Sequence, residues 1–407
     1  METGLLILSV FTVAFAMLAK RLSTSILTAP MVFLGFGFVL SQTGMMPHAG
    51  AEEGLHLVAE IALILLLFLD AAQIDLAALR KRHIWPARML GLGLPLAIGL
   101  GTLAAMPFLP GWPLVAVALV ASILAPTDAA LGQAVVSNPV VPERTRRALT
   151  VESGLNDGLA LPVVLLFASL AGEVSQPETT DWIVFAGQQL VLGPIVGIAA
   201  GTVGGVLLMR AQDRGLTSAT FEGIGAISLA GMAYLGASEI GGNGFIAAFV
   251  AGLCFGNTVK GRCKFVYEFT ESEGQLLTWG AFFLLGLALV PEALEHLTGE
   301  MLAIILISLL VVRPVAIWLS LTGTDASPST RLFFGWFGPR GLATALFALL
   351  VVKSISGEFG EQVLNLAVNA VWISALLHGL SALPGSKIYA ARIARMGECP
   401  VTQPADD

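Results

Sequence analysis

Most of the chain consists of apolar stretches long enough to cross a lipid bilayer, and this pattern limits its fold more than any other feature. A helix needs about 20 mostly apolar residues to cross the hydrocarbon core. Only 12% of the residues are charged, roughly half the share in soluble domains, so a water-facing surface could not be covered. Hydropathy predicts an all-α polytopic membrane protein with about thirteen transmembrane helices. The predicted spans cover approximately residues 4–19, 26–40, 55–72, 87–106, 114–136, 148–171, 182–208, 218–235, 242–256, 276–290, 301–321, 332–352 and 363–383.

The basic residues predict the orientation of these spans, because cytoplasmic loops are enriched in lysine and arginine. With the N-terminus outside, all but three of the 21 basic residues fall in or beside cytoplasmic loops or the tail. The exceptions are Lys353 in an outer loop and Arg313 and Arg340 within spans. We therefore expect a single transmembrane domain over residues 1–385 and a short cytoplasmic tail over 386–407.

Other functional classes lack support in the sequence. A net charge of -7 does not indicate a nucleic-acid partner, and the dipeptide Gly-Lys of a P-loop never occurs, which argues against a nucleotide. The cysteines and histidines follow no metal-ligand spacing. We expect no cofactor, and the lipid bilayer as the surroundings of the protein.

Two predicted spans are interrupted at corresponding places. The fifth span contains Pro126 in Ala-Pro-Thr-Asp, and the twelfth contains Pro339 in Phe-Gly-Pro-Arg-Gly. The two correspond if spans 1–6 and 8–13 are inverted repeats with span 7 as a linker. Interrupted helices in both halves of a chain indicate a transporter's binding site, whereas a proline kink without function is the alternative. Span 7 carries glycines at every fourth position from Gly193 to Gly205, which predicts either close packing or a sliding surface.

Several ionisable residues lie within the predicted spans, where they are costly and indicate function. At a rise of about 1.5 Å per residue, Asp70, Asp128, Asp157 and Arg313 reach similar depths between the midplane and its cytoplasmic half. Ser153 and Asp157 share one helix face and offer two hard oxygen ligands. Glu152 needs a positively charged partner to stay ionised, and Arg313 on span 11 is the natural one.

These stretches resemble the monovalent cation/proton antiporters, specifically the sodium/proton branch with an Asn-Asp pair (NhaP-like). The resemblance is carried by residues 125–130 (Ala-Pro-Thr-Asp-Ala-Ala), by 151–158 (Val-Glu-Ser-Gly-Leu-Asn-Asp-Gly), by Arg313-Pro314 and by 337–343 (Phe-Gly-Pro-Arg-Gly-Leu-Ala). It covers the whole thirteen-span plan.

The resemblance implies that spans 5 and 12 are crossed discontinuous helices with the cation at their crossing. It implies that Asp157 binds the cation and the proton in turn. Ser153, the surroundings of Thr127, Asn156 and an acid on span 3, here Asp70, complete the expected ion- and proton-binding residues. Asp157, Ser153, Thr127 and Asp70 would be the ligands of a monovalent metal cation.

The remaining roles that the resemblance implies are structural. Glu152 and Arg313 would form an ion pair, while Asp128 and Arg340 would compensate the half-helix ends. The same resemblance implies a homodimer, and we expect the protein in a plasma membrane, namely a bacterial inner membrane.

The expected function is secondary exchange of Na⁺ (also Li⁺) for H⁺, electroneutral at one to one and by alternating access. K⁺/H⁺ exchange on the same fold is an alternative, and a cation channel is another, although a channel needs a continuous pore. An intramembrane aspartyl enzyme using Asp128 and Asp157 is a third alternative. It is disfavoured by the basic residues nearby, so the chain is expected to be a transporter and not an enzyme.

Overall fold

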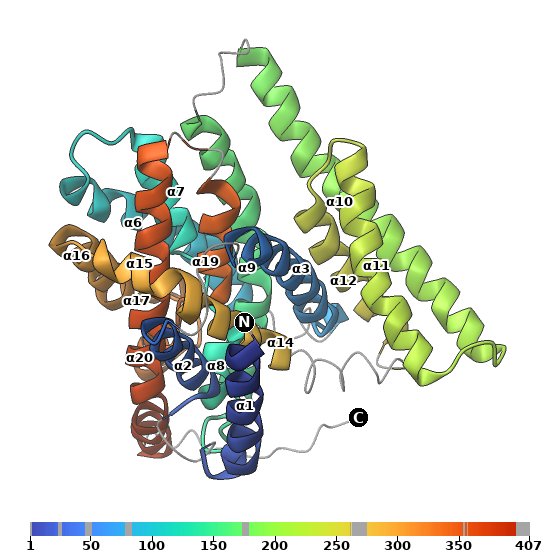
Figure 1. Ribbon diagram of the computed structural model, residues 1–407, viewed down its shortest axis with the longest axis horizontal. Coiled ribbons are helices and arrows are strands. Elements are labelled where there is room, and N and C mark those ends of the chain that lie inside the picture. The colour runs from blue at the N-terminus through green and yellow to red at the C-terminus, as the bar shows by residue number, and fades with distance from the viewer. Residues whose placement is uncertain are drawn as a thin grey trace.

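The computed structural model describes residues 2–22, 27–44, 51–77, 84–172, 179–260, 262, 275–352, 355 and 357–395, and all secondary structure in these ranges is helical (Figure 1). Every predicted span overlaps at least one helix. The helices are α1 (Glu2–Leu22), α2 (Ala29–Gln42), α3 (Ala51–Ala72), α5 (Ile84–Arg88), α6 (Leu94–Ala105), α7 (Leu114–Ile123), α8 (Ala129–Val136), α9 (Glu143–Ala171), α10 (Thr179–Asp213), α11 (Ala219–Glu239), α12 (Gly244–Val259), α14 (Gln275–Leu284), α15 (Val290–Glu295), α16 (Gly299–Ile307), α17 (Arg313–Ser320), α18 (Pro328–Trp336), α19 (Leu342–Val351) and α20 (Gly357–Arg395). Short 3₁₀ and π segments are η1 (Met89–Gly93), η2 (Met106–Phe108), η4 (Leu285–Leu289) and η5 (Ser308–Val312).

The helices have the length and the apolar exterior of membrane-spanning elements. Among the described residues, six stretches are long and apolar enough to cross a membrane, and five shorter apolar helices accompany them. The six are Ile84–Phe108, Glu143–Ala171, Val191–Asp213, Gln275–Glu295, Gly299–Ser320 and Phe359–Arg395. Large apolar side chains remain exposed along their outer faces, including Val191, Ile195 and Ile198 of α10, each more than half exposed. Lipid, not water, is the solvent that such a surface fits.

The fourth span of each predicted repeat carries the same irregularity. In one, the π-helical segment η1 precedes α6, whose second residue is Pro95; in the other, η5 precedes α17, whose second residue is Pro314. A proline has no backbone N–H and displaces the preceding turn, which a π-helical turn accommodates. The segments also pack reciprocally, with η1 against α17 and η5 against α6.

The glycine ladder of span 7 packs α10 onto α12. A Cβ atom added at Gly193, Gly197 or Gly201 would fall within 2.3–2.8 Å of the α12 backbone or of Asn243 at its start. Gly252 and Gly256 on another face of α12 meet the Phe68 and Ala72 carbonyls of α3 in the same way. The glycines therefore allow the close packing of α10 on α12 that one of the two predictions for span 7 required. Figure 1 shows α10, α11 and α12 together at one end of the molecule, with α3 between them and α9.

Helix α20 continues past residue 385, where the cytoplasmic tail was expected to start. Tyr389 and Ile393 are buried, at 4% exposure each, among side chains of α5, α9 and α18. The Tyr389 hydroxyl lies 3.0 Å from both Thr145 Oγ1 and Thr330 Oγ1. These two apolar positions lie four residues apart and so share a helix face, which explains why the first ten residues of the expected tail pack as helix. Residues 396–407 lie outside the described residues.

Candidate ion site

The two interrupted spans meet where their backbones leave the helical conformation. The chain is non-helical between α7 and α8 and again between α18 and α19. The Asp128 N–H donates to the Pro339 carbonyl oxygen across 2.9 Å, which joins the two breaks directly. The Asp128 carboxylate accepts one hydrogen bond from Leu131 N–H (2.9 Å) and one from Leu342 N–H (2.7 Å). A single carboxylate therefore caps the positive N-terminal ends of both α8 and α19.

Arg340 supplies the opposite charge at the same crossing. Its Nη1 donates to the carbonyl oxygens of Ala125 (2.7 Å) and Pro126 (3.0 Å), just beyond the end of α7. The residue is 1% exposed. A proline in a helix frees a carbonyl, and a helix C-terminus carries negative partial charge, so a buried guanidinium suits this position. Asp128 and Arg340 thus lie where compensation of the half-helix ends requires them.

Glu152 on α9 and Arg313 on α17 are in contact beside the crossing. Arg313 Nη1 and Nη2 donate to the two Glu152 oxygens at 3.1 and 3.2 Å, and both side chains are 4% exposed. Arg313 Nη2 also lies 3.4 Å from the Phe334 carbonyl oxygen near the end of α18. The bidentate geometry is the favourable form of a buried ion pair.

Three of the expected ion ligands form a separate buried network. The Thr127 hydroxyl donates to Glu152 Oε2 (3.3 Å), lies 3.2 Å from Ser153 Oγ and accepts from Asn156 Nδ2. Asn156 Nδ2 also lies 3.5 Å from Glu152 Oε1, because residues four apart on α9 share a face. Thr127 and Asn156 are each 1% exposed and do not line the cavity described next. In this arrangement the side chains of Thr127, Ser153 and Asn156 contact one another or Glu152.

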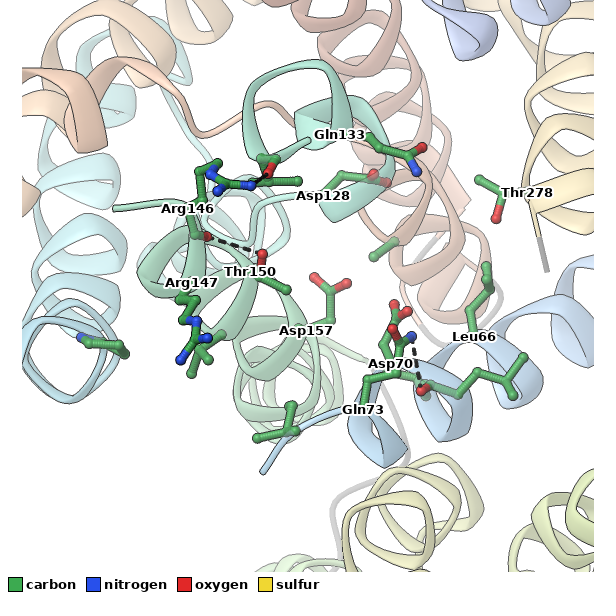
Figure 2. A pocket seen from close by; sticks show the side chains of 18 of the residues that line it. Leu66, Asp70, Gln73, Asp128, Gln133, Arg146, Arg147, Thr150, Asp157 and Thr278 are labelled. Atoms are coloured by element: carbon green, nitrogen blue, oxygen red, sulfur yellow. Dashed lines mark hydrogen bonds between the residues drawn. The ribbon is translucent and has the colours of Figure 1, made fainter. Parts of the chain in front are cut away.

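Asp157 and Asp70 instead line a cavity of about 810 Å³. Figure 2 shows Asp157 of α9 pointing into this space, with Asp128 on one side and Asp70 of α3 on the other. Asp157 Oδ1 is buried, and none of the described side chains or backbone groups donates a hydrogen bond to it. Among the described residues, no group of three His, Cys, Asp or Glu side chains is arranged to hold a metal. The predicted ligands Asp157, Asp70, Ser153 and Thr127 are therefore divided between the cavity and the network behind it.

Arg144, Arg146 and Arg147 also line the cavity, and two of them form ion pairs. Arg144 donates to Asp325 Oδ2 (2.6 Å) and lies 3.8 Å above the Trp85 ring, while Trp85 Nε1 donates to Asp325 Oδ1. The hydrogen bond from Arg144 is the main reason that the pKa of Asp325 lies below its usual range. Arg147 pairs with Glu143. Arg146 donates to the Val141 carbonyl oxygen (3.0 Å).

Sequence reasoning missed several residues at this site. Gln133, Ser137 and Thr278 line the cavity without any charge to mark them. His378 lies within predicted span 13 and is buried beside the second break, at 4% exposure. An ionisable residue inside a span was the signal that could have identified it.

Comparison with known proteins identifies the family of the chain. Residues 7–384 match the family described as "Sodium/hydrogen exchanger, transmembrane". The chain is 28% identical over 394 residues to the K⁺/H⁺ antiporter NhaP2 of a Shewanella species (strain MR-4), covering 94% of this chain and 66% of that protein. It is 26% identical over 339 residues to the Na⁺/H⁺ antiporter ApNhaP of Aphanothece halophytica, covering 80% and 63%. The chain thus spans just under two thirds of the length of these relatives.

A solved structure has the same fold. The sodium proton antiporter MjNhaP1 from Methanocaldococcus jannaschii superposes with a TM-score of 0.72 at 21% sequence identity, covering 96% of this chain and 99% of that one. The all-helical architecture is therefore that of a known antiporter, and the family match extends over nearly all of the described residues. The chain belongs to the transmembrane sodium/hydrogen exchanger family, a family of monovalent cation/proton antiporters.

Proposed function

We propose that the chain is a secondary antiporter that exchanges Na⁺, and also Li⁺, for H⁺, with Asp157 carrying the two ions in turn. The observation that carries this proposal is the Asp157 carboxylate itself, which points into the cavity with one oxygen that no described donor satisfies. A carboxylate in such a place needs either a proton or a positively charged ligand. Cation and proton therefore compete for one group, which is the requirement for exchange.

Asp70, Ser153 and Thr127 are the further oxygen ligands in this proposal, and Asn156 orients Thr127. Asp70 lies on α3, which packs against α12. Asp157 lies on α9, which packs against α7, α8 and α19, helices that flank the two breaks. Movement of one group of helices against the other would then change the distance between the two carboxylates. This arrangement supports alternating access by rigid-body movement.

The presence of Arg144, Arg146 and Arg147 among the lining residues supports an opening of the cavity toward the cytoplasm, because basic residues favour that side. In the proposed orientation the protein crosses the bacterial plasma membrane thirteen times with its N-terminus outside. A homodimer is the proposed assembly.

The second candidate is K⁺/H⁺ exchange, which the printed name of the Shewanella relative favours. Purified protein in proteoliposomes with an internal pH dye separates the two. We expect Na⁺ and Li⁺ to move protons at lower concentrations than K⁺. A response to K⁺ alone would establish the second candidate, and no response to any of the three cations would refute antiport.

Exchange is expected to be electroneutral, because Asp157 is the one cavity carboxylate proposed to titrate. Asp128 is held by two backbone N–H groups, and residue 156 is an asparagine that adds no charge. While the protein exchanges Na⁺ for H⁺ at fixed ion and pH gradients, a membrane potential imposed with valinomycin should leave the exchange rate unchanged. A strong response would mean that a second carboxylate, Asp128 or Asp70, also titrates.

A further inference from the structure

His378 is a buried imidazole on α20 that the proposed exchange does not use. It lies beside the non-helical residues 337–341, which separate α18 from α19. Its Nε2 is 2.9 Å from the Trp336 carbonyl oxygen, at the end of α18. Its Nδ1 is 3.0 Å from Ser374 Oγ and 2.9 Å from the Ser374 carbonyl oxygen.

The partners of the two ring nitrogens determine where the imidazole proton lies. Both nitrogens face a carbonyl oxygen, which can only accept: Trp336 for Nε2 and Ser374 for Nδ1. Among the described residues Nε2 faces no other partner, whereas Nδ1 also faces the Ser374 hydroxyl, which can donate, so we assign the single hydrogen of the neutral ring to Nε2. Ser374 Oγ already accepts from the Arg340 N–H at 2.7 Å, which leaves the serine hydroxyl hydrogen free to reach His378 Nδ1. The result is a chain of hydrogen bonds that all run in one direction, from the Arg340 N–H through the Ser374 hydroxyl and the His378 ring to the Trp336 carbonyl oxygen.

This chain of hydrogen bonds connects both ends of the break in span 12 to α20. Trp336 precedes the non-helical residues and Arg340 is their fourth member, while Ser374 and His378 stand one turn apart on the continuous helix α20. Gly338 N–H shares the Trp336 carbonyl, so His378 is its second donor. A side chain that adds such a bond fixes the turn relative to α20 as well as satisfying the backbone.

The residues that this chain of hydrogen bonds holds lie where the two helix breaks meet. The Arg340 side chain binds the carbonyl oxygens of residues 125 and 126, and Pro339 and Leu342 bind Asp128. Asp128 lines the cavity into which Asp157 points. The charged groups that act on His378 itself are Arg340 and Arg313, the latter paired with Glu152.

We propose that His378, as the neutral tautomer with its hydrogen on Nε2, is a positioning residue for ion exchange that holds the span-12 break against α20. It acts through Ser374, Arg340 and Asp128 and does not touch the ion. The inference rests on the proposed antiport, since it concerns the rate and affinity of that reaction.

The test compares His378→Leu, His378→Gln and Ser374→Ala with wild type in proteoliposomes. His378→Leu should raise the apparent KM for the driving cation about tenfold and shift the pH profile of exchange, the size expected for losing one buried hydrogen bond. His378→Gln retains an amide donor for Trp336 and should recover most of the affinity.

Ser374→Ala should resemble His378→Leu, and the double variant should be no worse than either. His296→Gln, at an exposed histidine near the end of α15, is the matched control and should match wild type.

Nitrogen-15 NMR of histidine-labelled protein in lipid tests the tautomer without transport, and His378→Gln identifies the resonance. A hydrogen on Nδ1, or on both nitrogens at neutral pH, would overturn the proposal. So would His378→Leu protein with wild-type KM and pH profile, including the case in which only thermal stability falls. Absence of exchange in wild-type liposomes would refute the antiport instead and leave the tautomer result standing.

Discussion

Asparagine in place of Asp157 is expected to reduce exchange to the level of empty liposomes while leaving the protein folded. The substitution is nearly isosteric, and the described structure contains no donor to Asp157 Oδ1 whose loss would destabilise the fold. An amide neither releases a proton in this pH range nor carries the charge that a cation would balance. Dye-based exchange assays with Na⁺, Li⁺ and K⁺, together with size-exclusion profiles, measure both parts of this expectation.

Glu143→Gln is the matched control for this experiment. It makes the same change from carboxylate to amide at another residue that lines the cavity, where Glu143 pairs with Arg147. Exchange by the control should be close to that of wild type. Substantial exchange by Asp157→Asn would mean that another carboxylate carries the proton, and the proposed role of Asp157 would be wrong.

Removing one member of the Glu152–Arg313 pair should be the most destabilising change near the site. Glu152→Ala leaves a guanidinium that is 4% exposed without its carboxylate and also removes the acceptor of Thr127. Breaking a buried pair in this way costs about 3–5 kcal/mol. The double variant Glu152→Ala with Arg313→Ala should recover part of the loss, which thermal unfolding of the purified proteins would measure as a double-mutant cycle.

The Arg144–Asp325 pair offers a control on the same helix, α9. Its side chains are 43% and 56% exposed, so water screens the interaction and its loss should cost less than about 1 kcal/mol. If the losses from Glu152→Ala and Arg313→Ala simply add, the two residues are not energetically coupled. The buried pair would then lack the stabilising role that its geometry suggests.

Features that depend on the cost of charge or of broken helices in a membrane could be predicted from the sequence. Buried Glu152 required a cation, and the prolines at 126 and 339 required interruptions that free backbone groups. In each case a buried charge or a freed backbone group needs a partner, and the spans contain few charged residues that could supply one. The compensating roles of Asp128 and Arg340 came instead from the resemblance to the antiporter family.

Features that depend on a choice among several partners could not be predicted. Thr127, Ser153 and Asn156 can serve as ion ligands and can also bind one another, and only the packing of α9 against the first break shows that they are in contact. Asp128 was expected to compensate half-helix ends, but the sequence did not indicate that its two oxygens cap α8 and α19 together. The pairing of His378 with Ser374 and Trp336 likewise requires α20 to lie beside the second break.

Competition between cation and proton for a single carboxylate is the central claim, and the pH dependence of the apparent cation KM tests it most directly. Wild-type protein in proteoliposomes should be assayed over a cation series at each of several pH values, without a membrane potential. If the proton and the cation exclude each other at Asp157, KM should rise as pH falls, approaching about tenfold per pH unit for one proton, while the maximal rate at saturating cation stays nearly constant. A KM that does not change with pH would contradict the account.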